Sequence, residues 1–388
     1  MKIVHIMLGC FYIDNHSYQE NMLPKYHKMM GHEVEIIAST LSFDDRGNAC
    51  NVEAKSYINE DGIVVTRLPY KKVLVPKCRA KVGKFFRIYE GFKIALEKSK
   101  PDIVFVHGCQ FCDIGILVKY LKTHLVTVYV DNHADFSNSA RNWISRNVLH
   151  GIMWKWCAQK IEPYTKRFYG VLPARVDFLK NIYKLPENKI ELLVMGADDE
   201  MVKRVTTEKN RHDLREKYNL SDSDFVIITG GKIDHAKRQV LTLLRILKDY
   251  PQMNLRVLVF GSIVDDMRQE LMSYVDGKKI QFIGWLNNEQ TARCIAASDL
   301  AVYPGRHSVL WEETVGLGVP MVVKRWDGTT HVDVGGNVVF IENDADISKT
   351  LTDLLHDMDR YEKMKCISRS KGMQTFSYED IARRSIKS

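Results

Sequence analysis

Short apolar runs alternate with longer amphipathic segments along the whole chain, and this alternation constrains the fold more than any other feature. Runs of about four to eight residues rich in Val and Ile predict buried strands, and the segments between them predict helices. Repeated strand–helix units form parallel sheets with helices on both faces. Helices are predicted at 18–30, 82–98 and 114–122. Strands are predicted at 2–8, 33–39, 63–69, 102–108, 125–132, 168–174, 190–196, 225–231, 255–261, 280–284, 300–304 and 321–325.

The length of the chain, 388 residues, exceeds what one hydrophobic core usually organises. A polar and strongly charged stretch at 198–218 separates two sets of predicted strands. We therefore expect an α/β protein of two Rossmann-like domains, at 1–203 and 204–370. The basic, amphipathic segment 371–388 is expected to form a helix that packs back on the first domain.

The first residues read as a strand and not as a signal peptide. Their apolar run is interrupted by His5 and lacks a small-residue cleavage site. No later run reaches the roughly 18 apolar residues that a membrane-spanning helix needs, so we expect a cytoplasmic protein. The dispersed cysteines argue against a disulfide scaffold. Cys109 and Cys112 have the CxxC spacing and are expected to be buried structural thiols, with a redox role as the alternative.

Residues 71–100 are strongly basic, with only Glu90 and Glu97 as acidic residues. Apolar and aromatic side chains are interleaved with the basic ones, a pattern that fits an anionic membrane surface. The alternatives are a solvated helix face and a nucleic-acid site, and no nucleic-acid motif accompanies the stretch. The basic residues are Lys71, Lys72, Lys77, Arg79, Lys81, Lys84, Arg87, Lys93, Lys98 and Lys100.

A first polar cluster follows the predicted strand 225–231. Gly231 allows a tight turn, and Lys232 and Lys237 come directly after it. Two lysines at the carboxyl end of a parallel strand can converge on one polyanion such as a diphosphate. The alternative is an ordinary strand-to-helix turn with surface lysines. The spacing matches neither the Walker loop nor GxGxxG.

A second polar cluster follows the predicted strand 300–304. A helix that starts near Ser308 would aim its first amides at a phosphate, and a carboxylate one turn later could accept hydrogen bonds from a ribose. Gly318 and Pro320 would end that helix. The candidate residues of this cluster are Arg306, His307, Ser308, Val309, Glu312 and Glu313.

The order strand–Gly–Lys–x4–Lys, then strand–Pro–loop–Glu–x4–Gly–x–Pro, resembles GT-B glycosyltransferases, in particular the retaining family 4 (glycosyl transferases group 1). The stretch ELLVMGAD at 191–198 resembles that family's domain junction, and the resemblance covers essentially the whole chain. It implies a GT-B fold, in which two Rossmann-like domains face each other across a cleft. It also implies that Lys232 and Lys237 bind the donor diphosphate, that Glu313 binds the ribose, and that amides near Ser308 and Val309 contact phosphate.

One position departs from the family pattern. The family's first glutamate lies eight residues before the second, and Gly305 stands there in this chain. Because that glutamate contacts the donor sugar in the family, the sugar stays open. Arg306, His307 or Glu312 could take its place.

In the first domain, dense polarity follows the predicted strand 125–132. A histidine in the corresponding place of many family members lies near the transferred sugar, which makes His133 the candidate for that role, with a loop-bracing histidine as the alternative. Asp135 could orient His133 or the acceptor. Gln19 and Glu20 open the first helix and could face the cleft, although Glu20 could equally be an N-terminal helix acid.

We therefore expect a retaining glycosyltransferase that moves a sugar from a nucleoside-diphosphate sugar to a saccharide or lipid-linked acceptor, in bacterial cell-surface polysaccharide synthesis. Catalysis would use His133, Lys237 and Lys232 without a metal or other cofactor. The expected partners are the donor, the acceptor and the inner face of the plasma membrane through 71–100, with no nucleic acid. The alternatives are a GT-B sugar-nucleotide epimerase or hydrolase and a catalytically degenerate binding protein.

Overall fold

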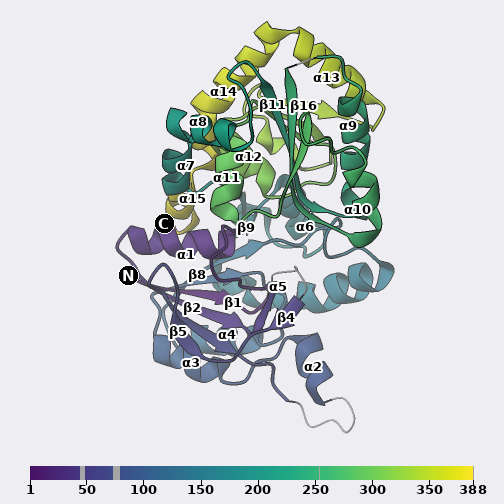
Figure 1. The fold of residues 1–388 in the computed structure, drawn as a ribbon. Coiled ribbons are helices and arrows are strands. Elements are labelled where there is room, and N and C mark those ends of the chain that lie inside the picture. The colour runs from purple at the N-terminus through teal and green to yellow at the C-terminus, as the bar shows by residue number, and fades with distance from the viewer. Residues whose placement is uncertain (44–48, 73–78, 253, 388) are drawn as a thin grey trace. The chain divides into compact units, whose positions relative to one another are not determined.

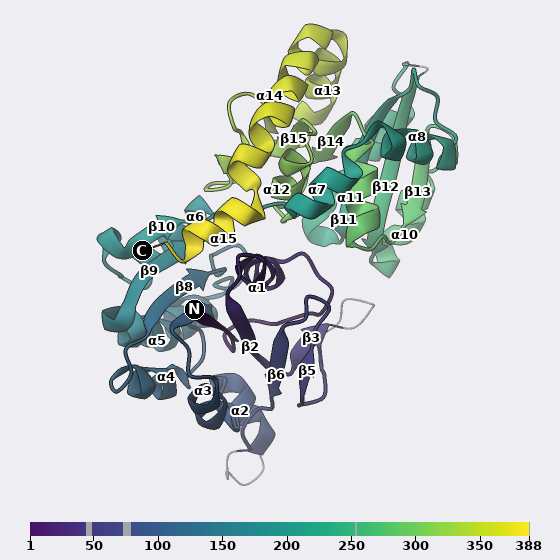
Figure 2. The ribbon, with the colours of Figure 1, turned by 90° about the vertical axis from the view of Figure 1, so that its left-hand side faces the viewer.

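The computed structural model describes residues 1–43, 49–72, 79–252 and 254–387. The chain divides into two compact units, Met1–Val194 with Asp380–Ser388, and Met195–Glu379, whose elements are labelled in Figure 1 and seen from a second side in Figure 2. The sequence placed the boundary after residue 203, whereas the units part between Val194 and Met195. The last residues of the chain count with the first unit.

The first unit is built on an eight-stranded sheet in the order β10-β9-β8-β7-β1-β2-β6-β5. All neighbours in it are parallel except β5 and β6. Its strands are β1 (Lys2–Met7), β2 (Glu33–Ser39), β5 (Ser56–Ile58), β6 (Val64–Leu68), β7 (Ile103–His107), β8 (Thr127–Asn132), β9 (Thr165–Gly170) and β10 (Ile190–Leu192). A separate antiparallel pair consists of β3 (Leu41–Phe43) and β4 (Ala49–Asn51).

Helices cover both faces of this sheet, with α1 on one face and α3 and α4 on the other (Figures 1 and 2). This cover buries the central strands β1, β7 and β8 almost completely. The helical elements of the unit are α1 (Gln19–Met29), α2 (Arg79–Phe86), α3 (Phe92–Ser99), α4 (Ile114–Leu121), the π-helix η1 (Ser145–Trp154), α5 (Lys155–Ile161), η2 (Glu162–Tyr164), α6 (Pro173–Asn181) and η3 (Glu187–Lys189).

The second unit has a six-stranded, wholly parallel sheet in the order β13-β12-β11-β14-β15-β16. Its strands are β11 (Phe225–Ile233), β12 (Leu255–Ile263), β13 (Ile280–Gly284), β14 (Leu300–Tyr303), β15 (Met321–Lys324) and β16 (Val338–Ile341). Its helical elements are α7 (Asp199–Val205), α8 (Glu208–Lys217), η4 (His235–Lys237), α9 (Gln239–Lys248), α10 (Asp265–Met272), α11 (Asn288–Ala296), α12 (Leu310–Gly316), η5 (Thr330–Val332), α13 (Asp346–His356) and α14 (Met358–Phe376).

The closing helix α15 (Tyr378–Ser385) carries the chain from the second unit into the first. Within the first unit, the carbonyl oxygen of Ala382 lies 3.0 Å from Nε2 of His27 on α1. The hydroxyl of Tyr169 on β9 donates to the carbonyl oxygen of Arg384 at 3.3 Å. No helix among the described residues is both long enough and apolar enough to cross a bilayer.

The predicted strands are found, but several predicted elements differ in extent, among them the strand expected at 190–196, which ends at Leu192. The helix expected at 82–98 is two helices, α2 and α3, because Arg87 (φ 50°) and Gly91 (φ 79°) take the left-handed conformation that ends a helix. The strand expected at 168–174 ends at Gly170, and α6 begins at Pro173, since proline favours the first turn of a helix.

The strands β11 and β12 approach each other closely at their carboxyl ends, where Gly231 is paired with Gly261. A Cβ atom on Gly261 would lie 1.9 Å from the carbonyl oxygen of Gly231, and the φ angle of Gly261 is +113°. The strand β12 can therefore not accept a side chain at Gly261.

We predict that Gly261→Ala destabilises the protein by roughly 1–3 kcal/mol more than Gly277→Ala, measured by urea unfolding. Gly277 has a similarly positive φ of +73° but no atom within 4 Å of its would-be Cβ. The control therefore carries the backbone cost of about 1 kcal/mol without the clash. Equal losses for the two variants would show that strand contact is not the cause.

Candidate functional site

The turn after β11 places Lys237 beside the glycines of that strand. The Asp234 carboxylate accepts a hydrogen bond from the amide of Ala236 at 3.0 Å, which starts η4. The Lys237 Nζ would lie 3.4 Å from a Cβ on Gly231. Burial lowers the pKa of Lys237, and the Arg306 charge acts in the same direction, against the opposite effect of Asp234. Lys237 is thus a half-buried cation at the end of a parallel strand.

The two clusters that the sequence singled out in the second unit meet at this point. Lys237 lines a small pocket together with Arg306 and Ser308, between the ends of β11 and β14. Ligands of open parallel sheets bind outside the carboxyl ends of the strands, so the location fits a binding site. Lys232 is exposed and does not line this pocket. The helix expected from Ser308 begins at Leu310, just after Val309.

Gly305 has a steric reason to be a glycine. A Cβ atom there would lie 3.0 Å from Cα and 3.1 Å from Cβ of Lys237. A glutamate at this position would have to push the Lys237 backbone away. The glycine at position 305, where the family pattern named above has a glutamate, therefore goes together with the close approach of Lys237.

Glu312 is fully buried and engages two histidines. Its Oε1 atom lies 2.9 Å from Nε2 of His307 and 2.8 Å from Nε2 of His331. Burial alone would raise the pKa of Glu312, but the charges and hydrogen bonds of the two histidines outweigh it and lower the pKa to about 2. His307 thus faces Glu312. No sequence pattern pointed to His331, which lies in the short helical turn η5.

The pKa of Glu313, the next residue on α12, is shifted in the opposite direction. Burial and the nearby negative charge of Asp198 raise the pKa of Glu313 to about 7. Asp198 lies in the Gly-x-Asp stretch and caps α7, where it accepts a hydrogen bond from the amide of Glu200. Two adjacent glutamates therefore differ in charge near neutral pH.

In the first unit, His133 follows β8 and faces two carboxylates. Its Nε2 atom lies 3.3 Å from Oδ2 of Asp131 and 3.9 Å from Oε1 of Glu20, and about a quarter of its side chain is exposed. Burial favours the neutral imidazole, but the charges of Glu20 and Asp131 outweigh it and raise the pKa of His133. His133 and Glu20 were chosen as candidate site residues from separate parts of the sequence, and the structure brings them together.

A row of buried histidines lies behind His133. Nδ1 of His107 is 2.8 Å from Oδ2 of Asp131, Nε2 of His107 is 2.9 Å from Nδ1 of His5, and Nε2 of His5 is 3.0 Å from Nδ1 of His27. Burial lowers the pKa of His5 and His27, the latter to about 3, so both are neutral.

A neutral imidazole has one proton to give, so this row has a direction. The charges of His107 and His133 outweigh burial and lower the pKa of Asp131, which is therefore ionised and requires a proton on the His107 nitrogen that faces it. At the other end of the row, the Ala382 carbonyl oxygen can only accept, so Nε2 of His27, 3.0 Å away, carries the proton there. Nδ1 of the neutral His27 then accepts from Nε2 of His5, and Nδ1 of the neutral His5 accepts from Nε2 of His107. The Ser385 hydroxyl, 3.0 Å from Nε2 of His27, donates to the same Ala382 carbonyl oxygen at 2.8 Å. His107 lies near the carboxyl end of the predicted strand 102–108, and this position is the sequence feature by which it could have been chosen as a candidate.

Two other candidates of the first unit are buried. Asp135 accepts from the amide of Ser137 at 2.6 Å and from Nε of Arg175 at 3.1 Å, so it braces its own loop. These groups outweigh burial and lower the pKa of Asp135. Gln19 is 1% exposed, and its side-chain amide has no hydrogen-bond partner among the described residues.

Two clusters have the ligand types that divalent metals accept, two imidazoles and a carboxylate. In each, the candidate ligand atoms lie within 4.8 Å of one another. In the second cluster, the imidazole nitrogens form hydrogen bonds of 2.8–2.9 Å with Oε1 of the glutamate, and these use the atoms that would face an ion. In the first cluster, the imidazole nitrogens lie at ion-pair distances of 2.8 and 3.3 Å from one carboxylate oxygen. The clusters are His107, Asp131 and His133 in the first unit and His307, Glu312 and His331 in the second.

No protein-family profile and no curated protein matches the chain. Solved structures match it over nearly its whole length. A sucrose-phosphate synthase from Thermosynechococcus elongatus has a TM-score of 0.69 at 14% identity, with 99% of this chain and 96% of that chain covered. The Anabaena protein Alr3699/HepE in complex with UDP has a TM-score of 0.65 at 12% identity, with 99% and 98% covered.

An enzyme of another class matches as well. The UDP-GlcNAc 2-epimerase from Neisseria meningitidis, bound to UDP-GlcNAc, has a TM-score of 0.61 at 14% identity, with 99% of this chain and 98% of that chain covered. Identities this low show the fold alone. The chain therefore has the GT-B fold of two Rossmann-like domains, and that prediction is confirmed.

We predict that Glu20→Gln lowers the pKa of His133 by about one unit, because a carboxylate at 3.9 Å favours the imidazolium. The measurement is a histidine proton NMR titration, with the His133 signal assigned by its loss in His133→Gln. Glu97→Gln, at an exposed position of α3, is the matched control and should leave the titration unchanged. An unaltered pKa in Glu20→Gln would contradict the assigned charge contact.

We also predict opposite stability effects for the two neighbouring glutamates. The folded-state pKa of Glu312 lies below the usual 4.5, so its ionised form stabilises the fold above pH 4.5 and this contribution is lost as the pH falls toward 2. Glu313 has a raised pKa, so the fold loses stability as the pH rises from about 4.5 through 7.

At pH 8, Glu312→Gln should therefore destabilise the protein by roughly 3 kcal/mol, and Glu313→Gln should stabilise it by about 1–3 kcal/mol. At pH 4, where Glu313 is protonated, Glu313→Gln should be close to neutral. Urea unfolding at both pH values tests this. A loss of stability in Glu313→Gln at pH 8 would overturn the assignment.

Proposed function

We propose that the chain is a retaining glycosyltransferase that moves a sugar from a nucleoside-diphosphate sugar to a saccharide or lipid-linked acceptor. The observation that carries this proposal is the meeting of Lys237, Arg306 and Ser308 in one pocket at the strand ends of the second unit. Among the described residues, Lys237 forms no ion pair with a carboxylate, so its charge is available to an anion. The fold, and the UDP in a solved structure that shares it, support a nucleotide-bound donor.

The donor residues have distinct tasks in this proposal. Lys237 and Lys232 neutralise the negative charge that develops on the departing diphosphate, which lowers the barrier electrostatically. Arg306 and the backbone near Ser308 and Val309 contact phosphate. Glu313 accepts hydrogen bonds from the ribose, a role that favours its ionised form.

Further residues of the second unit shape this site without donating to phosphate. Gly231 leaves room for the diphosphate beside Lys237. His307 and Glu312 hold each other through their hydrogen bond and so brace the loop that carries Arg306.

In the first unit, we assign His133 to the transferred sugar, and Gln19, Glu20 and Asp135 to the acceptor side. The unpartnered amide of Gln19 supports a polar ligand there. The acceptor hydroxyl attacks the anomeric carbon on the face that the diphosphate leaves. The bond to the phosphate oxygen breaks, and that oxygen takes the hydroxyl proton. The reaction proceeds without a metal or other cofactor.

A sugar-nucleotide epimerase is the second candidate, because an epimerase shares the fold at a comparable TM-score. A catalytically degenerate binding protein is the third, since Gly305 replaces the family's first glutamate. The three differ in their products. A transferase needs an acceptor, an epimerase converts the sugar nucleotide with water alone, and a binding protein leaves it unchanged.

We place the protein in the cytoplasm at the inner face of the plasma membrane, in bacterial cell-surface polysaccharide synthesis. Of the basic residues at 71–100, six are exposed, which supports contact with anionic lipid: Lys71, Lys72, Lys84, Lys93, Lys98 and Lys100. Lys77 lies outside the described residues, and so do the side chains of Arg79 and Lys81.

We predict that one of the nucleoside diphosphates UDP, GDP, ADP and TDP, screened without metal together with the monophosphate CMP, raises the melting temperature by about 3–8 °C near 100 times its Kd. Lys237→Ala should abolish most of this shift and lower turnover about 10²–10³-fold. Lys363→Ala, an exposed lysine of α14 in the same unit, is the matched control. A full shift in Lys237→Ala would refute the assignment, and addition of EDTA should change neither readout.

A further inference from the structure

The helical segment 143–161 exposes apolar side chains on the face that normally carries polar ones. It comprises Trp143 and Ile144 followed by η1 and α5. Its inner face is buried in the first unit through Trp154 and Ile161. A helix on a globular protein turns its polar face to water, so an apolar outer face indicates a further partner. The outer residues are Trp143 (71% exposed), Ile144 (62%), Val148 (41%), Ile152 (66%) and Trp156 (50%).

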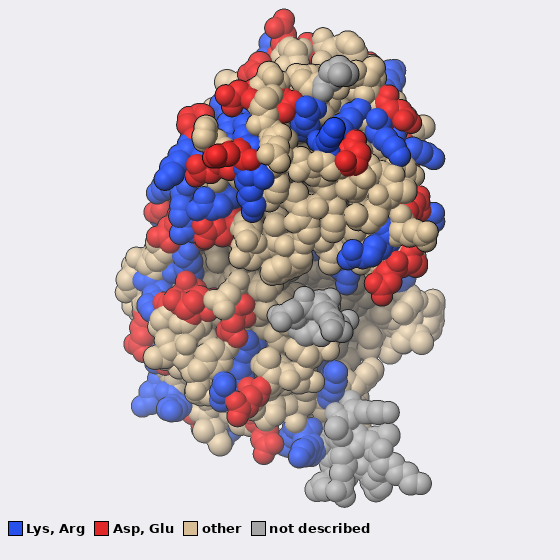
Figure 3. All heavy atoms as spheres, viewed as in Figure 1, with Lys and Arg blue, Asp and Glu red and all other residues tan. Residues whose placement is uncertain are grey.

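All charged side chains of this segment are basic. Residues 136–161 contain Arg141, Arg146, Lys155 and Lys160 and no aspartate or glutamate. Nζ of Lys160 lies 4.1 Å from the ring centre of Trp156, so cation and exposed ring lie side by side. Over much of the face that Figure 3 draws, by contrast, acidic and basic side chains are mixed.

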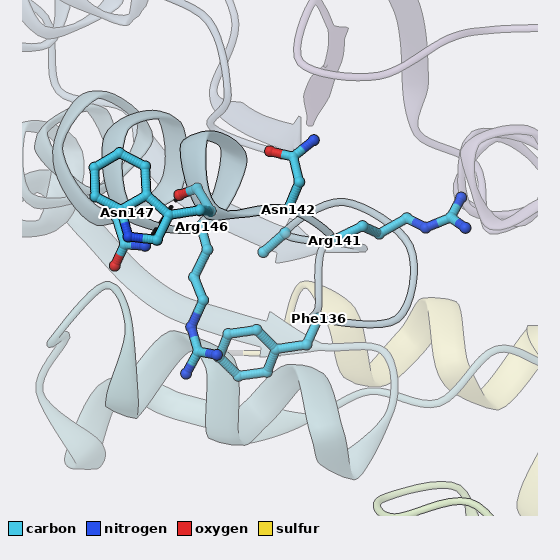
Figure 4. A pocket seen from close by; sticks show the side chains of 7 residues that line it. Phe136, Arg141, Asn142, Arg146 and Asn147 are labelled. Carbon is cyan, nitrogen blue, oxygen red and sulfur yellow. Dashed lines mark hydrogen bonds between the residues drawn. The ribbon is translucent and has the colours of Figure 1, made fainter.

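A pocket of about 550 Å³ adjoins the start of the segment (Figure 4). Two arginines, two asparagines and two aromatic rings line it: Arg141, Arg146, Asn142, Asn147, Phe136 and Trp143. The guanidinium of Arg146 lies 4.5 Å from the ring centre of Phe136. The side chain of Arg141 extends away from Phe136 (Figure 4). Guanidinium groups bind phosphate bidentately, and aromatic rings and amides bind a sugar face.

We propose that residues 136–160 dock on an anionic bilayer, with the outer apolar side chains in the interfacial layer and the pocket around a phosphate-bearing lipid head group. Tryptophan, isoleucine and basic residues on one helix face are the composition that lies in a membrane interface. Nucleic acid offers the basic residues a partner but gives Ile144, Val148 and Ile152 no apolar contact. This inference rests on the proposed function for the nature of the acceptor, a saccharide phosphate carried by a lipid.

The pocket also lies next to the candidate residues in the sequence. Phe136 directly follows Asp135, and His133 is in the same loop. A head group held there is carried by the element that holds His133.

The test is sedimentation of the full-length protein with vesicles of phosphatidylcholine alone and of an equal mixture with phosphatidylglycerol. We expect binding to the mixed vesicles with a blue shift of tryptophan fluorescence. Trp143→Ser with Trp156→Ser should weaken binding about tenfold or more. Trp285→Ser, a tryptophan of the second unit that is 66% exposed, is the matched control and should bind like the unaltered protein.

Arg141→Gln with Arg146→Gln should reduce the preference for the anionic vesicles while leaving the fluorescence shift in part. The proposal is overturned if the unaltered protein does not sediment with the mixed vesicles, or if the double tryptophan variant sediments as well as the control. It is also overturned if the protein binds DNA and not the vesicles. Nucleotide binding is measured without vesicles, and vesicle binding without nucleotide. A nucleotide shift without vesicle binding therefore refutes this inference alone, and the reverse result refutes the donor assignment alone.

Discussion

A parallel sheet must be covered by helices on both faces, because both of its faces are apolar. Nearly every strand pair in the two large sheets is parallel. This constraint dictates the repeated strand–helix order of the chain and leaves only the strand ends for polar groups. The candidate residues lie there: Lys237 after β11, Arg306 after β14 and His133 after β8. The chemistry of the protein is thus confined by the way its core is buried.

The close glycine contact between β11 and β12 shows how backbone geometry serves the candidate donor site. A Cβ on Gly231 would lie 3.4 Å from Nζ of Lys237, so this lysine lies close over the strand. The same crowding reaches Gly305, where a side chain would meet the Lys237 backbone. Lys237 is thus packed against glycines near the ends of β11 and β14. In the proposed donor site, Lys237, Arg306 and backbone amides would carry the binding of phosphate.

The fold could be predicted from the sequence because apolar runs report burial directly. The strands and the two Rossmann-like domains followed from that pattern, and the polar clusters were found because they come directly after predicted strands. The GT-B architecture followed from the resemblance to a known family. The partners of those residues could not be predicted. His331 meets Glu312 only because a distant loop folds over α12. His5 and His107 look like ordinary core positions within strands, and their hydrogen bond exists only once β1 and β7 are paired. The break at Arg87 was missed because a positive φ in a non-glycine residue leaves no mark in the periodicity.

The first unit is completed by the last residues of the chain, since Asp380–Ser388 belongs to it and Ser385 lies against His27. During synthesis the ribosome releases residues 1–194 long before these final residues emerge. Until then the outer end of the histidine row lacks the Ala382 carbonyl oxygen that accepts from it, and one face of the sheet lacks its last helix. The part of the protein that is made first therefore depends on residues that are made after the whole second unit, and its sheet keeps an uncovered place for α15 until then.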